Sequence, residues 1–278
     1  MSMWNDQSHL KLDDEDFAQA PQLWGRPDAR FVVCSPDGVD IADGCLHLQT
    51  ITQPYIPAQC CLLDADRALF VRPASAGDGP LTPLRAAWFM LDEAQAQAAI
   101  AGVALTSWHA DYGFCAACGQ ATNVEDGGWV RRCPGCKRQH FPRIDPAIIV
   151  ALVDGDDRLL LGSHADWGKR RSVFAGFVMA GESLEQAVHR EVREETGLVI
   201  RDIKYFGSQP WPFPRSLMVA FTARVDRPQD LHIDQHEIVR ANWYSREEMQ
   251  AKWASGDLEP PAPVSIAMRL ITSWLESQ

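Results

Sequence analysis

The sequence Gly176-Phe-Val-Met-Ala-Gly-Glu-Ser-Leu-Glu-Gln-Ala-Val-His-Arg-Glu-Val-Arg-Glu-Glu-Thr-Gly-Leu198 combines clear helix signals with a concentration of acidic side chains. Ser183 is followed three residues later by Gln186, and this capping box predicts the start of a helix. Gly197 is typical of the position after a helix ends, because glycine adopts the left-handed conformation without strain. We therefore expect one helix over Leu184–Thr196.

Within this helix the apolar and the acidic residues lie on adjacent arcs. Apolar residues at intervals of four predict one buried stripe, made of Leu184, Val188 and Val192. Glu194 and Glu195 follow Glu191 by three and four residues, so the carboxylates share one arc and repel, by roughly a few tenths of a kcal/mol per pair. A divalent cation removes that repulsion, and carboxylate oxygens without nearby thiol or imidazole groups suit Mg²⁺ or Mn²⁺. The alternative interpretation is a solvated acidic face that pairs with Arg190 and Arg193.

The glycines, acidic residues and arginine of this stretch match G-x5-E-x7-R-E-U-x-E-E-x-G-U, where U is apolar, at every fixed position. The stretch resembles the Nudix box without a departure. The resemblance implies a loop–helix–loop that binds divalent metal, on an α/β sandwich that hydrolyses nucleoside diphosphates linked to another moiety. It further implies that Glu191, Glu194 and Glu195 hold metal or activate water, and that Arg190 and Glu182 brace the loop. Among these residues we expect Glu195 to be the essential carboxylate.

Two CxxC pairs precede the box, Cys115 with Cys118 and Cys133 with Cys136, and fourteen residues separate the pairs. Four thiolates at this spacing are typical of tetrahedral Zn²⁺, and because they leave no open position for water we expect the zinc to be structural. Two disulfides or free thiols are the alternative. The segment also carries five basic residues: Arg131, Arg132, Lys137, Arg138 and Arg143. Such charge suits either nucleic-acid binding or a solvated face.

A proline-rich segment follows the box, Ser208-Gln-Pro-Trp-Pro-Phe-Pro-Arg-Ser216, with prolines at alternate positions. Proline fixes φ and removes a backbone donor, so we expect a rigid, extended segment that presents Trp211 and Phe213. The segment matches SQPWPFPxS. Because the four-cysteine ribbon, the Nudix box and this segment occur in this order, residues 85–276 resemble the NADH pyrophosphatase family of Nudix hydrolases. The first 80 residues match that family only loosely.

This resemblance implies hydrolysis of the pyrophosphate of NAD(H) to nicotinamide mononucleotide, reduced when NADH is the substrate, plus AMP. It also implies removal of NAD caps from RNA 5′ ends, which leaves 5′-monophosphate RNA. Further metal ligands are implied in the carbonyl of Ala175 and the carboxylate of Glu237. The implied substrate site consists of Arg85, Phe141, Phe177, Gln209, Pro210, Trp211, Pro212, Phe213, Pro214, Arg215, Ser216 and Ala267. Members of the family share the site across two chains, so we expect a homodimer.

Around these motifs the sequence predicts an α+β protein of three parts. We expect residues 1–110 to form a β-rich, Nudix-like N-terminal domain that mediates dimerisation, and residues 111–141 to form the zinc ribbon. Residues 142–278 are expected to form the Nudix domain, an α/β/α sandwich with a mixed sheet.

Local patterns predict the elements of these parts. In the first part we expect strands over 30–34, 46–51 and 68–72, then a helix capped by Asp92 that stops near Gly102 and a second helix to about Tyr112. In the last part we expect strands over 147–153, 158–161, 202–208, 217–225 and 238–244. The helices expected there cover 184–196, 246–253 and 264–276.

The chain has 278 residues and a formal net charge of −11, from 26 Lys and Arg against 37 Asp and Glu. Charge of this sign repels nucleic acid and anionic membranes, so an anionic substrate must be met locally, by metal or arginine. The acidic N-terminal segment does not resemble a secretory signal, and the longest apolar run, residues 147–153, is too short to span a membrane. We therefore expect a cytoplasmic protein that does not bind membranes.

Two other functions fit part of the pattern. A hydrolase of ADP-ribose or dinucleoside polyphosphates shares the chemistry and differs in the pocket, and the proline-rich segment argues against it. A non-catalytic zinc-ribbon module that binds RNA or senses a nucleotide would be supported by a degenerate box, whereas Glu191, Glu194 and Glu195 are all present.

Overall fold

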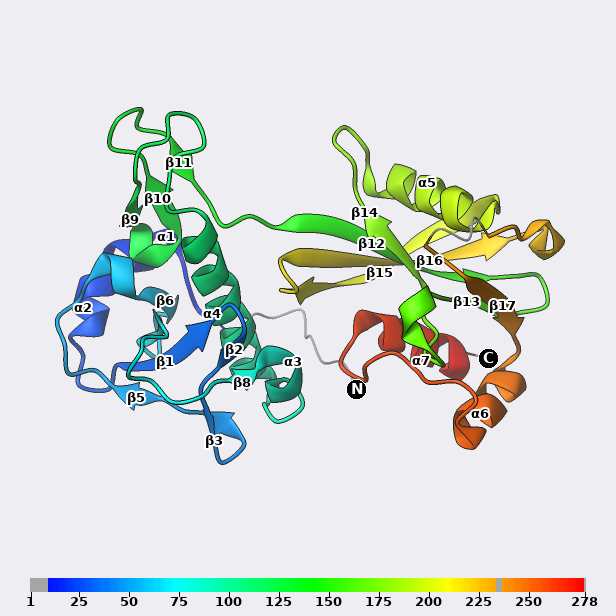
Figure 1. Cartoon of the computed structure of the whole chain (residues 1–278), viewed down its shortest axis with the longest axis horizontal. Coiled ribbons are helices and arrows are strands. Elements are labelled where there is room, and N and C mark those ends of the chain that lie inside the picture. The colour runs from blue at the N-terminus through cyan, green and yellow to red at the C-terminus, as the bar shows by residue number, and fades with distance from the viewer. Residues whose placement is uncertain (1–9, 234–236, 278) are drawn as a thin grey trace. The chain divides into compact units, whose positions relative to one another are not determined.

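The computed structural model describes residues 10–233 and 237–277 (Figure 1). They divide into two compact units, which are described separately. The first holds the chain up to Arg143 together with Pro212–Arg215, and the second holds Ile144–Trp211 together with the chain from Ser216 onward. Within the described residues, no helix has both the length and the apolar character needed to cross a membrane.

The first unit is built on a six-stranded sheet in the order β6–β7–β1–β2–β8, with β5 paired to β1. Its strands are β1 (Arg30–Ser35), β2 (Gly38–Val39), β5 (Gln49–Thr50), β6 (Cys61–Asp64), β7 (Leu69–Pro73) and β8 (Thr82–Pro83). A separate ribbon is formed by β3 (Ile41–Ala42) and β4 (Cys45–Leu46). The β-rich character predicted for this region is confirmed. The single strand expected over 46–51 is wrong, because β4 and β5 are separate strands that pair with different partners.

Three short helices accompany this sheet. They are α1 (Asp14–Ala18), α2 (Ala20–Trp24) and α3 (Leu84–Ala87). Of these, α2 and α3 have buried residues and α1 has none. Trp24 packs edge-on against Phe70 with ring centroids 4.9 Å apart, and its indole N–H donates to the Gln53 carbonyl at 2.9 Å. Both rings are buried, so this contact fixes α2 on the sheet.

Helix α4 (Glu93–Asp111) is continuous, so the expected break at Gly102 is wrong. Asp92 caps the helix as predicted, since its carboxylate accepts a first-turn backbone N–H at 2.8 Å. Gly102 lies against the sheet: a Cβ there would be 2.9 Å from the sulfur of Cys34 and 3.2 Å from Cγ2 of Val71. Glycine is therefore needed for close packing, which a local sequence pattern does not distinguish from a helix stop.

A small three-stranded sheet follows α4, in the order β11–β10–β9 (Figure 1). Its strands are β9 (Asn123–Glu125), β10 (Val130–Arg132) and β11 (Gln139–His140). The segment that leads into β9 and the turn between β10 and β11 carry the two CxxC pairs.

The second unit is built on a six-stranded sheet in the order β15–β16–β12–β13–β17, with β14 paired to β12. Its strands are β12 (Asp145–Val153), β13 (Leu159–Ser163), β14 (Phe174–Phe177), β15 (Ile200–Trp211), β16 (Ser216–Val225) and β17 (Arg240–Tyr244). Its helices are α5 (Leu184–Thr196), α6 (Arg246–Ser255) and α7 (Ile266–Glu276). Strand β12 runs parallel to β16 and antiparallel to β13, so the predicted mixed sheet is confirmed.

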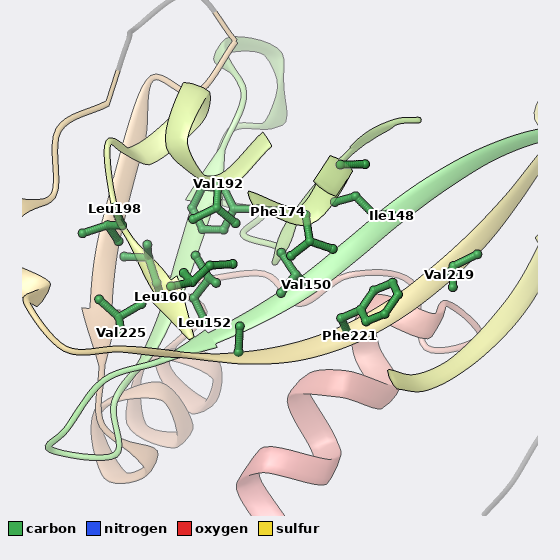
Figure 2. Packing of buried hydrophobic residues seen from close by; sticks show 14 of the residues in the cluster. Ile148, Val150, Leu152, Leu160, Phe174, Val192, Leu198, Val219, Phe221 and Val225 are labelled. Atoms are coloured by element: carbon green, nitrogen blue, oxygen red, sulfur yellow. The ribbon is translucent and has the colours of Figure 1, made fainter. Parts of the chain in front are cut away.

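Alternate residues of β12 supply two separate cores on the two faces of this sheet. Ile148, Val150 and Leu152 pack in one cluster with Val188 and Val192 of α5 (Figure 2). The intervening residues of β12 pack in a second cluster with residues of α6 and α7: Ile149, Ala151 and Val153 with Met249, Leu270, Ile271 and Trp274. Because side chains alternate across a strand, helices cover both faces, as the expected sandwich requires.

The proline-rich segment is not one extended stretch, and that expectation is wrong. Residues up to Trp211 end β15, Pro212–Arg215 form a turn, and Ser216 begins β16, so the segment closes a hairpin. Pro210 fits in β15 because this strand lies at the edge of the sheet, where a missing backbone donor costs little. The Phe213–Pro214 peptide in the turn is cis.

Candidate active site

Helix α5 begins and ends as the sequence predicts. Ser183 Oγ accepts the Gln186 N–H at 3.2 Å, Gln186 Oε1 accepts the Ser183 N–H at 2.8 Å, and Gly197 ends the helix with a φ of 69°. Val188 and Val192 are fully buried against the sheet. This stripe fixes the rotation of the helix about its axis and thereby sets the direction of each carboxylate.

The three carboxylates of α5 differ widely in exposure. Glu195 is 5% exposed, whereas the side chains of Glu191 and Glu194 are 13% and 51% exposed. Burying a carboxylate costs free energy unless a partner or a cation compensates for the lost water. Glu195, which the sequence indicated as the essential carboxylate, is therefore the carboxylate whose charged form most needs a partner or a cation.

Arg190 connects the helix to the loop that precedes it. Its Nε and Nη2 donate to the two carboxylate oxygens of Glu182 at 2.6 and 2.9 Å, and Nη2 also donates to the Phe177 carbonyl at 2.9 Å. Its Nη1 donates to Glu191 at 2.7 Å and to Glu194 at 3.0 Å. Such a planar, bidentate arrangement suits arginine and no other cationic side chain. The loop and the acidic arc are thus held in one arrangement.

Glu182 has a second task in the loop. Its Oε2 accepts the Met179 N–H at 2.9 Å in addition to the bond from Arg190. The guanidinium of Arg190 and this backbone donor lower the pKa of Glu182 to about 2, and the carboxylates around Arg190 raise its pKa. Glu182 therefore stays ionised at any physiological pH.

Gly176 on β14 makes room for one of the carboxylates. A Cβ at this position would lie 2.0 Å from Cδ of Glu191 and 2.1 Å from its Oε1. Any side chain at position 176 would therefore overlap the Glu191 carboxylate and displace it. The first glycine of the box thus leaves the space that the Glu191 carboxylate occupies, a role that only the folded chain shows.

The donor chemistry around α5 fits a hard divalent cation. Carboxylate oxygens are the groups present, and no cysteine or histidine takes part in the Arg190 network. Glu191, Glu194 and Glu195 do not, however, already form a group with three ligand atoms close together, the only such group among the described residues being the four cysteines. Arg190 Nη1 is bonded to two of these carboxylates, which offsets their repulsion in this arrangement.

The two further expected ligands both belong to the second unit. Ala175 is exposed on β14, directly before Gly176. Glu237 is exposed and follows residues 234–236, which are outside the described part of the chain.

The expected substrate residues divide between the two units. Phe177, Gln209, Pro210, Trp211, Ser216 and Ala267 belong to the second unit; Arg85, Phe141 and the turn Pro212, Phe213, Pro214 and Arg215 belong to the first. Phe177 and Phe141 are 58% and 61% exposed, so both rings are open to a partner. Within the first unit, the guanidinium carbon of Arg85 lies 3.9 Å from the centroid of the Phe213 ring. Gln209 differs from the others, because its side chain is completely buried.

The four cysteines lie together in the geometry of a tetrahedral metal site. Their sulfurs all lie within 4.8 Å of one another, with separations of 3.6 Å for Cys115–Cys136, 3.4 Å for Cys118–Cys133 and 3.8 Å for Cys118–Cys136. Zn–S bonds of about 2.3 Å in a tetrahedron place sulfurs about 3.8 Å apart. None of the four forms a disulfide.

Backbone donors favour the thiolate form of two of the four cysteines, whereas the pKa of Cys118 is raised to about 11, because the lowering by the Gln120 backbone is outweighed by the neighbouring thiols. The Ala117 N–H lowers the pKa of Cys115 to about 7, and the Cys136 N–H lowers the pKa of Cys133 to about 6. Thiolate is the form that binds metal, so the residues present fit a structural Zn²⁺.

The basic residues of the ribbon are only partly available to a ligand. Arg131 donates to Thr122 Oγ1 at 2.7 Å and to His109 Nδ1 at 2.8 Å, and Arg132 donates to Glu125 at 2.6 Å. Burial lowers the pKa of His109 to about 4, so this histidine accepts from Arg131 as a neutral ring. No local pattern indicated His109, because this histidine lies on α4 and its partners Gly128 and Arg131 lie in the ribbon.

Comparisons with known proteins agree with both motifs. Residues 143–262 match the model of the NUDIX domain, and residues 110–141 match the model of the NADH pyrophosphatase zinc ribbon domain. The NAD-capped RNA hydrolase NudC of Mycobacterium bovis (strain BCG / Pasteur 1173P2) is 43% identical over 82% of this chain and 69% of its own length. The protein of the same name from Enterobacter sp. (strain 638) is 41% identical over 65% of this chain and 67% of its own length.

Proposed function

The chain belongs to the Nudix hydrolases, as a relative of the NAD-capped RNA hydrolases that carry the zinc ribbon, and from this membership we propose its reaction. It hydrolyses the pyrophosphate of NAD(H) to nicotinamide mononucleotide plus AMP, and it removes NAD caps from RNA 5′ ends to leave 5′-monophosphate RNA. The observation that supports this most strongly is the complete arginine–carboxylate network on α5, in a chain that also has the cysteine geometry of the ribbon.

Glu191, Glu194 and Glu195, with Glu237 and the carbonyl of Ala175, would hold Mg²⁺ or Mn²⁺. A divalent cation bound there supplies positive charge that neutralises the pyrophosphate and polarises its phosphorus. Arg190 and Glu182 hold the loop and the carboxylates of α5 in fixed positions relative to each other.

Glu195 is the essential carboxylate in this proposal, because burial makes its charge most responsive to a neighbouring cation or proton. The four cysteines hold a structural Zn²⁺ that leaves no position for substrate.

Aromatic side chains supply the recognition of the nucleotide. The exposed rings of Phe177 and Phe141 are flat faces on which a nicotinamide ring stacks, and Trp211 and Phe213 are held by the prolines of the hairpin. Arg85, Arg215, Ser216 and the backbone at Ala267 complete the substrate site.

The proposal extends to assembly and location. The first unit acts as a Nudix-like dimerisation domain, the active protein is a homodimer, and it works in the cytoplasm. Residues 1–110, 111–141 and 142–278 are the proposed N-terminal, ribbon and catalytic domains.

The test is kcat/KM for NADH and for a NAD-capped RNA, measured side by side with Mn²⁺ at one salt concentration. Glu195→Gln should lower both by about 10²- to 10⁴-fold, the range of a positioned acid or base, with an unchanged unfolding transition. Glu185→Gln, an exposed glutamate on the same helix, is the matched control and should keep wild-type rates.

Each outcome has a meaning. Wild-type turnover by Glu195→Gln contradicts the assigned role. If ADP-ribose or a dinucleoside polyphosphate is cleaved with the larger kcat/KM, the substrate assignment is wrong, and if no nucleotide is cleaved the chain is a binding module. A tenfold preference for capped RNA, about 1.4 kcal/mol in the transition state, makes RNA the main substrate.

A further inference from the structure

Gln209 is the only glutamine among the described residues whose side chain is completely removed from solvent. It lies on β15, two residues before the turn of the hairpin. A primary amide buried without partners costs several kcal/mol, so its contacts indicate why it is retained.

Both polar groups of this amide bond to the backbone before α7. Its Nε2 donates to the Val264 carbonyl at 2.8 Å, and its Oε1 accepts the Ile266 N–H at 2.7 Å. The amide thus pairs with the chain on either side of Ser265 as a neighbouring strand would. Its buried hydrogen bonds span 55 and 57 residues of sequence.

The segment that Gln209 holds has few backbone hydrogen bonds of its own, the one before α7 being from the Ser265 N–H to the Ala262 carbonyl at 2.9 Å. Three of its residues, Pro260, Pro261 and Pro263, have no N–H to donate. Its earlier anchor is the Glu259 carbonyl, which accepts the Arg171 N–H at 3.0 Å. After that point, the Ser265 cap and the Gln209 amide together hold the start of α7, and the Gln209 bonds tie it to the sheet.

The hydrogen bonds of the first turn leave one donor open. Gln209 takes the Ile266 N–H, and Ser265 Oγ takes the Met268 N–H at 3.2 Å. For the Ala267 N–H the described part of the chain provides no acceptor. Ala267 is the backbone position assigned above to substrate.

We infer that Gln209 is a positioning residue: it does not touch the substrate, and it fixes the start of α7 so that the backbone at Ala267 meets the nucleotide. The inference rests on the proposed function and deepens it, because it replaces a direct substrate contact at Gln209 with an indirect one. A displaced backbone donor weakens substrate binding and leaves the carboxylates of α5 unaffected, so the loss falls on KM and not on kcat.

The first test is Gln209→Met, which keeps the length of the side chain and removes both hydrogen bonds. We expect KM for NADH to rise about tenfold, kcat to change by less than about threefold, and hydrogen exchange at residues 266–270 of the free protein to become at least tenfold faster. Gln250→Met, the same substitution at an exposed glutamine of α6, is the matched control.

Two results would overturn the inference. If KM rises while hydrogen exchange at the start of α7 is unchanged, Gln209 touches the substrate itself. If exchange becomes faster while KM is unchanged, the hydrogen bonds of Gln209 to the start of α7 have no part in substrate binding. Absence of NADH hydrolysis in both the wild type and Gln250→Met is different, because it overturns the proposed function and the role of Gln209 in it together.

A second variant covers the case in which Gln209→Met does not fold. Gln209→Glu keeps the acceptor for the Ile266 N–H and loses the donor to the Val264 carbonyl while its carboxylate is ionised. Protonation restores a donor, so KM relative to wild type should fall as the pH is lowered. If the ratio of the Gln209→Glu KM to the wild-type KM does not change with pH, the hydrogen bonds of Gln209 do not position the substrate site and the inference is wrong.

Discussion

Helix α4 in the first unit and helix α5 in the second are long helices that each pack against a mixed sheet. They differ in the number and the placement of their charged side chains. Helix α4 is rich in alanine, and its charged residues are confined to its two ends. Helix α5 buries a short apolar stripe together with Glu195 and presents Arg190, Glu191 and Glu194 beside it. The comparison teaches that the sheet-facing residues make a helix stable, while the remaining surface decides whether it performs chemistry.

A glycine makes room at each helix, for a different reason. Gly102 lies in α4 itself and brings the helix close to Cys34 and Val71 of the sheet. Gly176 lies on a strand and accommodates the carboxylate of Glu191. One glycine therefore serves packing and the other serves the site, and substitutions at the two should separate stability from activity.

The largest effect is expected for Gly176→Ala. The new methyl group would overlap the Glu191 carboxylate, and a displacement of about 1 Å in a catalytic group can cost about 10²-fold in rate. We expect kcat/KM for NADH to fall by about this factor, with unfolding changed by less than about 1 kcal/mol. Gly207→Ala is the control, because a Cβ at that position meets no atom within 4 Å. Equal losses of kcat/KM in both variants would show that Gly176 has no special role in making room for Glu191.

Arg190→Lys should have the next largest effect. The bonds of Arg190 to Glu182, Glu191 and the Phe177 carbonyl start from three different nitrogens, whereas all donors of lysine sit on one nitrogen and cannot reach the same positions. We therefore expect kcat/KM to fall by about tenfold or more. Arg193→Lys, at an exposed position of the same helix, should leave kcat/KM unchanged. Full activity of Arg190→Lys would show that the bidentate network is dispensable.

Gly102→Ala tests the other side of the comparison. Alanine favours the helix by about 1 kcal/mol, but overpacking against Cys34 and Val71 costs about 1–3 kcal/mol, so a net loss of about 1 kcal/mol is expected. Denaturant unfolding measures the loss, and kcat should stay at the wild-type value. Gly113→Ala, which has open space around its Cβ, is the reference. A fall in kcat without a loss of stability would break the division between packing and chemistry.

The smallest effect is expected for the ion pair of Arg72 with Asp78 in the first unit, which is comparable to the pair of Arg190 with Glu182 in the second. Arg72 lowers the pKa of Asp78 to about 2, as Arg190 does for Glu182. A carboxylate with a lowered folded-state pKa contributes stability above its unfolded-state pKa, near 4, and loses it as the pH falls through about 2. Asp78→Asn should therefore lower stability by about 1 kcal/mol or less at pH 7, and the difference from wild type should shrink as the pH falls from about 4 toward 2, as measured by thermal unfolding. A difference from wild type that is the same at pH 2 as at pH 7 would contradict this origin.

Much of the second unit could be predicted, because its signals are local. The bounds of α5, its capping box and the Gly197 stop depend on residues at most four apart, and all agree with the structure. The hairpin β12–β13 follows from an apolar run, a turn and a second apolar run. Predictions that needed a distant partner were less successful: the proposed stop at Gly102 ignored the sheet beneath it, and the extended proline-rich segment ignored the pairing of β15 with β16.

The sequence by itself determined the four-cysteine ribbon and the helix with its carboxylates, because spacing along a short segment fixes which side chains share a face. The reaction class followed from the resemblance of these motifs to the Nudix hydrolases. The tertiary structure alone decided that Glu195 is buried and Glu194 exposed, that Gly176 cradles Glu191, and that Gln209 holds the start of α7. The physical reason is that burial and hydrogen-bond partners at these positions come from residues far away in the chain, and only the folded packing brings them together.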